Sequence, residues 1–270
     1  MELGLTDLAF VVTGGSRGIG MATTRLLLDE QAFVIACARS DESAERARVE
    51  LSAYGDRVTV VVGDLRQPDA AEAILKKAQN FAGSIAGIVN NAAAFGIDSG
   101  HPDREAWNDL FELKLLGYES VIQASLPYMA DGGAIVNVSG LAALKHVPGS
   151  PHVTAVNAAV LALSRYYAAA LAKQGVRVNT VVPGTTETDR YRSRIVKYSE
   201  LHQVDLAEAK RRLDATVPTG RPISPSEVGS AICFLLSPIA RSISGSTLVV
   251  DGAAAVVSPE QTVMGGSRDA

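Results

Sequence analysis

Short runs of apolar residues, rich in Val and Ile, alternate along the chain with longer stretches that have helical periodicity. Continuous apolar runs are typical of strands that helices cover on both faces, as in a parallel sheet. The runs that predict strands are LAFVVT (8–13), AFVIAC (32–37), RVTVVV (57–62), AGIVNN (86–91), GAIVNVS (133–139), VRVNTVV (176–182) and TLVVDG (247–252). Helices are expected over 18–29, 41–53, 68–82, 103–130, 152–173 and 225–236. The pattern predicts an α/β fold with one doubly wound parallel sheet.

One segment departs from this alternation. Residues 185–220 insert a charged, helix-prone stretch between a strand and the next core helix. Segments of this kind commonly cover a binding site as a mobile lid. We expect a single domain over residues 1–257 that includes this lid, and a loose polar tail over 258–270.

Composition narrows the class of protein. The chain has 270 residues, of which 47% are hydrophobic, and a formal net charge of -4, so it can bury one large core and has no basic field for nucleic acid. Cys37 and Cys233 lie in apolar segments and are expected as free thiols in a reducing compartment. Neither a secretory signal nor a membrane span is expected. These features favour a cytoplasmic protein that acts on a small molecule.

A glycine-rich turn, TGGSRGIG (13–20), follows the first predicted strand and opens the first predicted helix. Gly14 suits a backbone shape that a side chain would hinder, Gly18 allows a close approach to a pyrophosphate, and Gly20 allows tight packing of helix on sheet. The helix N-terminus then faces the anion. The turn therefore predicts a dinucleotide site.

The end of the second strand indicates which dinucleotide fits. A carboxylate there would bind a ribose 2′-hydroxyl and repel a 2′-phosphate, but this chain has Ala38 followed by Arg39. Arg17 in the glycine turn adds a second cation, and the two together favour NADP(H). A solvated loop charge is the alternative interpretation of Arg39.

Five motifs together resemble the short-chain dehydrogenase/reductase family: TGGSRGIG, VVGDL (61–65), VNNAA (89–93), VRVNTVVPGTTETD (176–189) and the stretch 220–254. The resemblance implies a Rossmann fold. It also implies that further residues line the cofactor path. These are Ser16 and Ile19 in the turn, Asp64 and Leu65 at the adenine, Asn91 and Ala92 after the fourth strand, and Pro183, Gly184 and Thr188 at the nicotinamide carboxamide.

In that family four side chains perform the chemistry: an Asn, a Ser, and a Tyr and Lys spaced Tyr-x-x-x-Lys. The family's spacings put Gly140 at the serine, Val153 at the tyrosine, Asn157 at the lysine and Lys114 at the asparagine. A shift of one residue would bring Ser139 and His152 into these positions, but it breaks the spacing to Pro183. The resemblance therefore implies an atypical active site, because valine can neither donate nor accept a proton.

Three residues are candidates for the missing catalytic roles. Asn157 would hydrogen-bond the nicotinamide ribose or, alternatively, cap its own helix. Lys114 would act as an acid or bind a substrate carboxylate if it is desolvated, although a surface lysine is the commoner case. His152 would serve catalysis, or capping, or an interface. The histidines have no ligand spacing, so no metal site is expected.

Three functions remain open. The first is an NADP(H)-dependent oxidoreductase with an atypical site, for example for conjugate (ene) reduction of an alkene. The second is a catalytically silent, cofactor-binding subunit of a hetero-oligomer with a related subunit, since the family usually assembles as a tetramer. The third is non-redox chemistry such as dehydration, isomerisation or cyclisation. Arg190, Arg192 and Arg194 in the lid would meet an acidic substrate or form a solvated face.

Overall fold

One parallel sheet organises the molecule. The computed structural model describes residues 2–93, 102–145 and 150–257, and within these ranges seven strands form a sheet in the order β3-β2-β1-β4-β5-β6-β7. The strands are β1 (Ala9–Val12), β2 (Phe33–Ala38), β3 (Val58–Val62), β4 (Ile85–Asn90), β5 (Met129–Val138), β6 (Arg177–Pro183) and β7 (Thr247–Val250). The order reverses direction between β1 and β4, which confirms the doubly wound fold. In such sheets ligands bind at this reversal, beyond the carboxyl ends of the strands.

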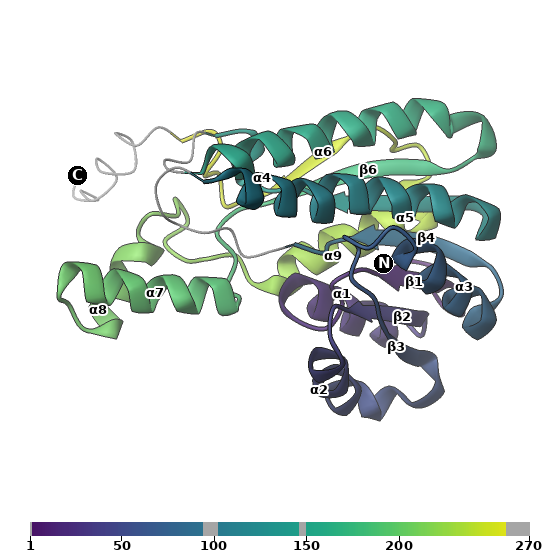
Figure 1. Ribbon diagram of the computed structural model, residues 1–270, viewed down its shortest axis with the longest axis horizontal. Helices are drawn as coiled ribbons and strands as arrows, with labels where there is room; N and C mark the ends of the chain where they lie inside the picture. The colour runs from purple at the N-terminus through teal and green to yellow at the C-terminus, as the bar shows by residue number, and fades with distance from the viewer. Residues whose placement is uncertain (1, 94–101, 146–149, 258–270) are drawn as a thin grey trace.

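Helices cover both faces of the sheet (Figure 1). Adjacent strand residues point to opposite faces, so Phe10 and Val12 of β1 join one buried apolar cluster and Val11 joins the other. Helix α1 packs against α9 on one side, while α3 packs against α5, and α4 against α6, on the other. The helices are α1 (Gly18–Asp29), α2 (Asp41–Leu51), α3 (Ala70–Ala82), α4 (Arg104–Phe111), α5 (Gly117–Ser125), α6 (Pro151–Ala170), α7 (Asp189–His202), α8 (Leu206–Asp214) and α9 (Pro225–Leu236).

The expected single helix over 103–130 was wrong. It is interrupted by a π-helical turn, η2 (Glu112–Leu116), between α4 and α5, and it ends at a 3₁₀ turn, η3 (Leu126–Tyr128). Proline at position 127 has no N–H for the helix ladder, so β5 begins at Met129, four residues earlier than expected. Lys114 lies in this π turn, so its side chain points in a different direction from the one that a continuous α-helix would give it.

Residues 185–220, which the sequence predicts to be a lid, form α7 and α8, and these helices extend to one side of the sheet (Figure 1). Its base is fixed by a bridge between Thr186 and Ile223. The expected loose tail lies outside the described residues. Among the helices that the structure describes, none combines the length and apolarity needed to cross a bilayer.

A buried cation closes the far end of the sheet. Arg177, the first residue of β6, donates to Leu235 O at 2.7 Å, Leu236 O at 3.2 Å, Ser237 O at 3.2 Å and Ile243 O at 3.4 Å. The last carbonyls of a helix have no partner within the helix. Arg177 therefore satisfies the end of α9 without a carboxylate among the described residues.

Candidate functional site

The glycine turn has the shape that a phosphate needs. Gly14 and Gly18 adopt positive φ angles of 63° and 54°, where other residues are strained. A Cβ on Gly14 would lie 3.0 Å from Asn91 Nδ2, and one on Gly20 would lie 2.1 Å from the Gly14 carbonyl. Helix α1 begins at Gly18, so its free N–H groups face the space left open. These residues fit the pyrophosphate of a dinucleotide.

A cavity of about 370 Å³ runs along this edge of the sheet. Most of the residues expected to bind the cofactor line it. They are Gly14, Ser16, Arg17, Gly18, Ile19, Arg39, Asp64, Leu65, Asn91, Ala92 and Thr188. Gly20, Asn157, Pro183 and Gly184 are not in its wall. Gly20 packs against Gly14 instead, and Gly184 packs against Asp251.

Asn91 holds the glycine turn in place. Its side-chain Nδ2 donates to the carbonyls of Thr13 at 3.1 Å and Gly14 at 3.2 Å. The Thr13 hydroxyl in turn accepts from the backbone N–H groups of Asn91 at 3.0 Å and Ala92 at 3.2 Å. The end of β4 and the end of β1 are thereby locked together at the centre of the cavity.

At one end of the cavity, Asp64 is held by an arginine that the sequence analysis did not single out. Arg66 forms a bidentate pair with Asp64 and also reaches Asp109 on α4. The hydrogen bonds from Arg66 hold the pKa of Asp64 below its ordinary value. The spacing Asp64-x-Arg66 is the only trace of this pair in the sequence, and its link to Asp109 depends on the fold.

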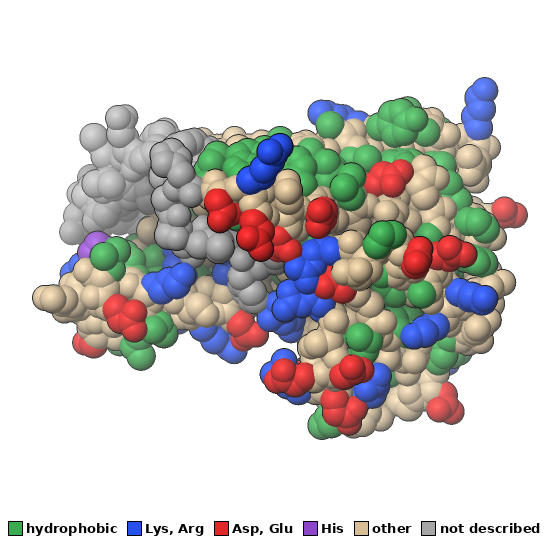
Figure 2. Space-filling view, in the orientation of Figure 1, with side chains coloured by type: hydrophobic (Ala, Val, Ile, Leu, Met, Phe, Trp, Pro, Cys, Tyr) green, Lys and Arg blue, Asp and Glu red, His purple; other side chains and the backbone are tan. Residues whose placement is uncertain are grey.

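Cations and hydroxyls gather where β2 ends. Arg39, Ser40, Ser43 and Arg46 join Arg17 in the cavity wall, together with Glu42, which pairs with Arg46. The Ser40 hydroxyl caps α2 by accepting from Ser43 N. Figure 2 shows Lys and Arg side chains gathered near the middle of that face, in the area of α1 and α2 in Figure 1. This end of the cavity suits an anionic group.

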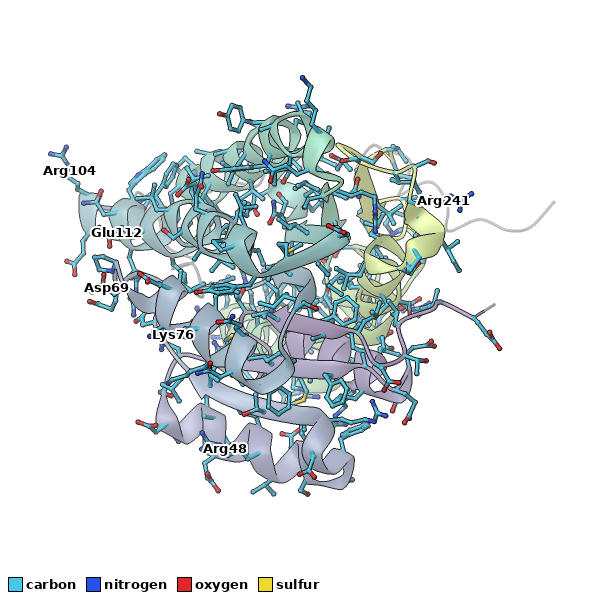
Figure 3. The ribbon with its side chains drawn as sticks, turned by 90° about the vertical axis from the view of Figure 1, so that its right-hand side faces the viewer. Arg48, Asp69, Lys76, Arg104, Glu112 and Arg241 are labelled. Atoms are coloured by element: carbon cyan, nitrogen blue, oxygen red, sulfur yellow. The ribbon has the colours of Figure 1, made fainter. Side chains whose placement is uncertain are left out.

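Lys114 is buried, with 6% of its surface exposed, so the expectation of a surface lysine was wrong. Glu112 of the same π turn points outward (Figure 3), as do Arg104 and Asp69 on neighbouring elements. The Lys114 ammonium donates to Asn157 Oδ1 at 2.7 Å and to the Ser139 carbonyl at 3.0 Å. An ammonium has three donors, and these two bonds fix it at the carboxyl end of β5.

Gly140 and Val153 each lie against Asn157. A Cβ on Gly140 would be 3.1 Å from Asn157 Oδ1, and Asn157 Nδ2 donates to the Val153 carbonyl at 2.8 Å. The Ser139 hydroxyl points to the Asn157 backbone carbonyl at 2.9 Å. Val153 places no proton donor at this point of the site, and the Lys114 ammonium is the charged group that contacts Asn157.

All seven tyrosines of the sequence lie in the part of the chain that the structure describes. None of them lines the cavity, so none replaces the proton donor missing at Val153. Tyr118 is fully buried, and its hydroxyl bonds to the carbonyls of Ala92 at 3.0 Å and Val138 at 3.3 Å. Burial raises its pKa. Tyr191 is bonded to Asp214 within the lid. Both phenols have structural partners.

His152 lies in the contact between α4 and α6. It is buried beside Trp107, with ring centroids 6.0 Å apart, and its Nδ1 has no partner. The structure therefore places His152 among packing residues. Its catalytic role stays a prediction. Within the described ranges, no three His, Cys, Asp or Glu residues form a group that could hold a metal; His101 and His146 lie outside them.

The electrostatics of Lys114 are unusual for a lysine. Burial lowers its pKa from 10.5 to about 7, and the positive charge of Arg190 adds to the effect. Arg190 is the second residue of α7 and lines the cavity beside Thr188. Arg192, two residues on and therefore about 200° round the helix, pairs with Asp189 instead. Of the three lid arginines, Arg190 is the one in the cavity wall.

Comparisons with known proteins agree with this geometry. A family model described as enoyl-(acyl carrier protein) reductase matches residues 14–253. L-rhamnose 1-dehydrogenase (NAD(P)(+)) of Azotobacter vinelandii is 34% identical over 261 residues, covering 92% of this chain and 96% of that protein.

Two solved structures are similar over almost their whole length. A variant of actinorhodin polyketide ketoreductase with NADPH has a TM-score of 0.86 at 29% identity, covering 93% of this chain and 98% of that one. A short chain oxidoreductase from Pseudomonas aeruginosa PAO1, described as containing an atypical catalytic center, has a TM-score of 0.85 at 32% identity, covering 99% and 100%.

Proposed function

The chain belongs to the short-chain dehydrogenase/reductase family, and from this premise we propose that it is an NADP(H)-dependent oxidoreductase in which Lys114 supplies the proton. The observation that carries the proposal is the buried Lys114 ammonium, 2.7 Å from Asn157 Oδ1. By the family resemblance the lysine and asparagine positions have exchanged residues. A cation still reaches the end of β5, but it comes from the π turn between α4 and α5 and not from α6.

The cofactor is proposed as NADP(H) on the residues of the cavity. When bound, it would supply a hydride to the substrate. The glycine turn and the α1 N-terminus would hold the pyrophosphate, and Arg17, Arg39 and Ser40 would hold a 2′-phosphate, which needs donors and positive charge. Thr188 lies close to Gly18, so it would cover the cofactor beside the glycine turn.

Lys114 would hold the proton at Nζ. A general acid works best when its pKa is near the working pH, and a pKa of about 7 meets that condition. Asn157 and the Ser139 carbonyl keep the ammonium in one position, and its third N–H is left for a substrate atom where negative charge develops. That atom is a carbonyl oxygen in ketone reduction, or the enolate oxygen in reduction of a conjugated alkene.

The test follows NADPH absorbance with a panel of ketones and conjugated enones. Lys114→Met is expected to lower kcat by about 10²- to 10⁴-fold, the usual contribution of a positioned acid, and to leave the Kd of NADPH unchanged. Lys173→Met, at an exposed lysine of η5 (Ala172–Gln174), is the control with full activity.

Three outcomes would reject the proposal. Equal kcat for wild type and Lys114→Met would remove Lys114 from the chemistry. Tight NADPH binding without any turnover would leave the silent cofactor-binding subunit, and product formed without consumption of NADPH would leave non-redox chemistry.

The assembly and the location are also proposals. We expect a homo-tetramer, or a hetero-oligomer with a related subunit, acting on a small molecule in the cytoplasm. Cys37 and Cys233 support a reducing compartment, because both are buried free thiols.

A further inference from the structure

The lid carries an arginine that none of the described carboxylates neutralises. On α7 and α8 the acidic and basic side chains largely pair with each other. Asp189 pairs with Arg192, Asp214 with Lys210, and Glu208 with both Arg211 and Arg212. Arg190 belongs to none of these pairs and instead lines the cavity.

Arg190 shares the cavity wall with Thr188, Asp189 and Leu113, and Leu113 is the neighbour of Lys114 along the π turn. The charge of Arg190 is close enough to act on the Lys114 ammonium. One cation, Arg190, thus lines the cavity, and the other, Lys114, lies directly after Leu113, which lines the same cavity. Like charges held together without an anion repel, and an anionic ligand between them relieves that repulsion.

We propose that the substrate carries a carboxylate, which the Arg190 guanidinium binds while the Lys114 ammonium faces the group to be reduced. The planar guanidinium binds a carboxylate through two parallel hydrogen bonds, which also fixes the orientation of the substrate. This inference rests on the proposed function and names the class of substrate for it. The cofactor pyrophosphate is the competing anion, but the glycine turn, the α1 N-terminus and Arg17 already offer it donors and positive charge.

The experiment measures binding without turnover. The probes are 4-oxopent-2-enoate, which has a ketone, a conjugated alkene and a carboxylate, and its methyl ester, which lacks the charge. Calorimetric titration into the complex with NADP⁺ avoids reduction, because the oxidised cofactor has no hydride to give. We expect the acid to bind at least tenfold more tightly than the ester, and Arg190→Met to abolish this difference.

Two further variants sharpen the test. Arg190→Lys is expected to recover part of the preference, because a lysine keeps the charge and loses the bidentate geometry. Arg192→Met is the matched control on the same helix, and it should leave both the preference and the Kd of NADPH unchanged.

The inference fails if acid and ester bind equally, or if Arg190→Met weakens NADPH binding tenfold and leaves the acid preference intact, which would assign the arginine to the cofactor. Failure of the proposed function is a separate result. Acid-selective binding without NADPH consumption would reject the reductase and keep the anion site, whereas turnover of neutral substrates without acid preference would reject the anion site alone.

Discussion

Two cations are buried at opposite ends of the sheet, and the structure treats them differently. Arg177 at the start of β6 donates to four backbone carbonyls, and Lys114 beyond the end of β5 donates to one carbonyl and one amide. Burial lowers the pKa of both groups. The guanidinium stays charged because its ordinary pKa is far above neutral pH, whereas Lys114, with a pKa of about 7, is divided between its charged and neutral forms at pH 7.

The difference separates a structural cation from a reactive one. A buried charge is stable when hydrogen bonds replace its water shell. Arg177 has four of its five N–H donors bonded to backbone carbonyls, and it does not exchange a proton near neutral pH. Lys114 has fewer partners and lies at the edge where ligands bind, so it can both lose and regain its proton.

The strongest way to break the comparison is Arg177→Met. We expect the free energy of unfolding to fall by about 4 kcal/mol, because each buried carbonyl left without a donor costs about 1–3 kcal/mol. Urea unfolding measures this loss. Arg177→Lys should recover only part, since its three donors cannot reach all four carbonyls. A loss below about 1 kcal/mol would show that the end of α9 does not need this cation.

Lys114→Met should change stability far less than Arg177→Met, because the loss of a donor for the Ser139 carbonyl and Asn157 Oδ1 is offset by the removal of a buried charge. The difference should also depend on pH. The pKa of Lys114 is about 7 in the folded chain and 10.5 ordinarily, so the unfolded chain holds more protons in this window. The stability of wild type relative to Lys114→Met therefore rises between about pH 7 and 10.

Urea unfolding of wild type and Lys114→Met at several pH values gives the difference between their free energies of unfolding. Other titrating groups are the same in both proteins, so their contributions cancel in this difference. A difference that stays flat with pH would place the lysine in a solvated environment and remove the contrast with Arg177.

A smaller effect is expected from Asn157→Asp. A carboxylate 2.7 Å from the ammonium would raise the pKa of Lys114, since an opposite charge at this distance favours the charged form. The basic limb of the pH profile of kcat should move up by about one pH unit or more. In the Lys114→Met background the same change should move nothing. An unchanged limb in the single variant would mean that another group supplies the proton.

Much of the scaffold could be predicted from the sequence. The starts of α1 and α9 agree with expectation, because Gly18 opens a motif with a fixed backbone shape and Pro225 follows the capping residue Ser224. The glycine turn predicted the cavity residues for the same reason: close contacts between backbone atoms admit few substitutes.

The reactive end could be predicted only in part. The family spacing brought Lys114 and Asn157 to attention, and the structure brings them into contact. The burial of Lys114 depends on a π turn, which leaves no periodic mark among apolar positions. Arg190 and Arg192 look equivalent in the sequence, and only the rotation of α7 against the cavity decides which one enters it.

In the π turn at Glu112–Leu116, the number of residues in the turn decides the direction in which the Lys114 side chain points. Adding or removing one residue in this turn would rotate the side chains within it by about 100°, while α4 and α5 keep their packing against α6 and α3. A deletion of one residue in this turn would therefore swing the ammonium out of the interior without altering a single amino acid's identity. Redesign of this pocket can begin from insertions and deletions rather than from substitutions.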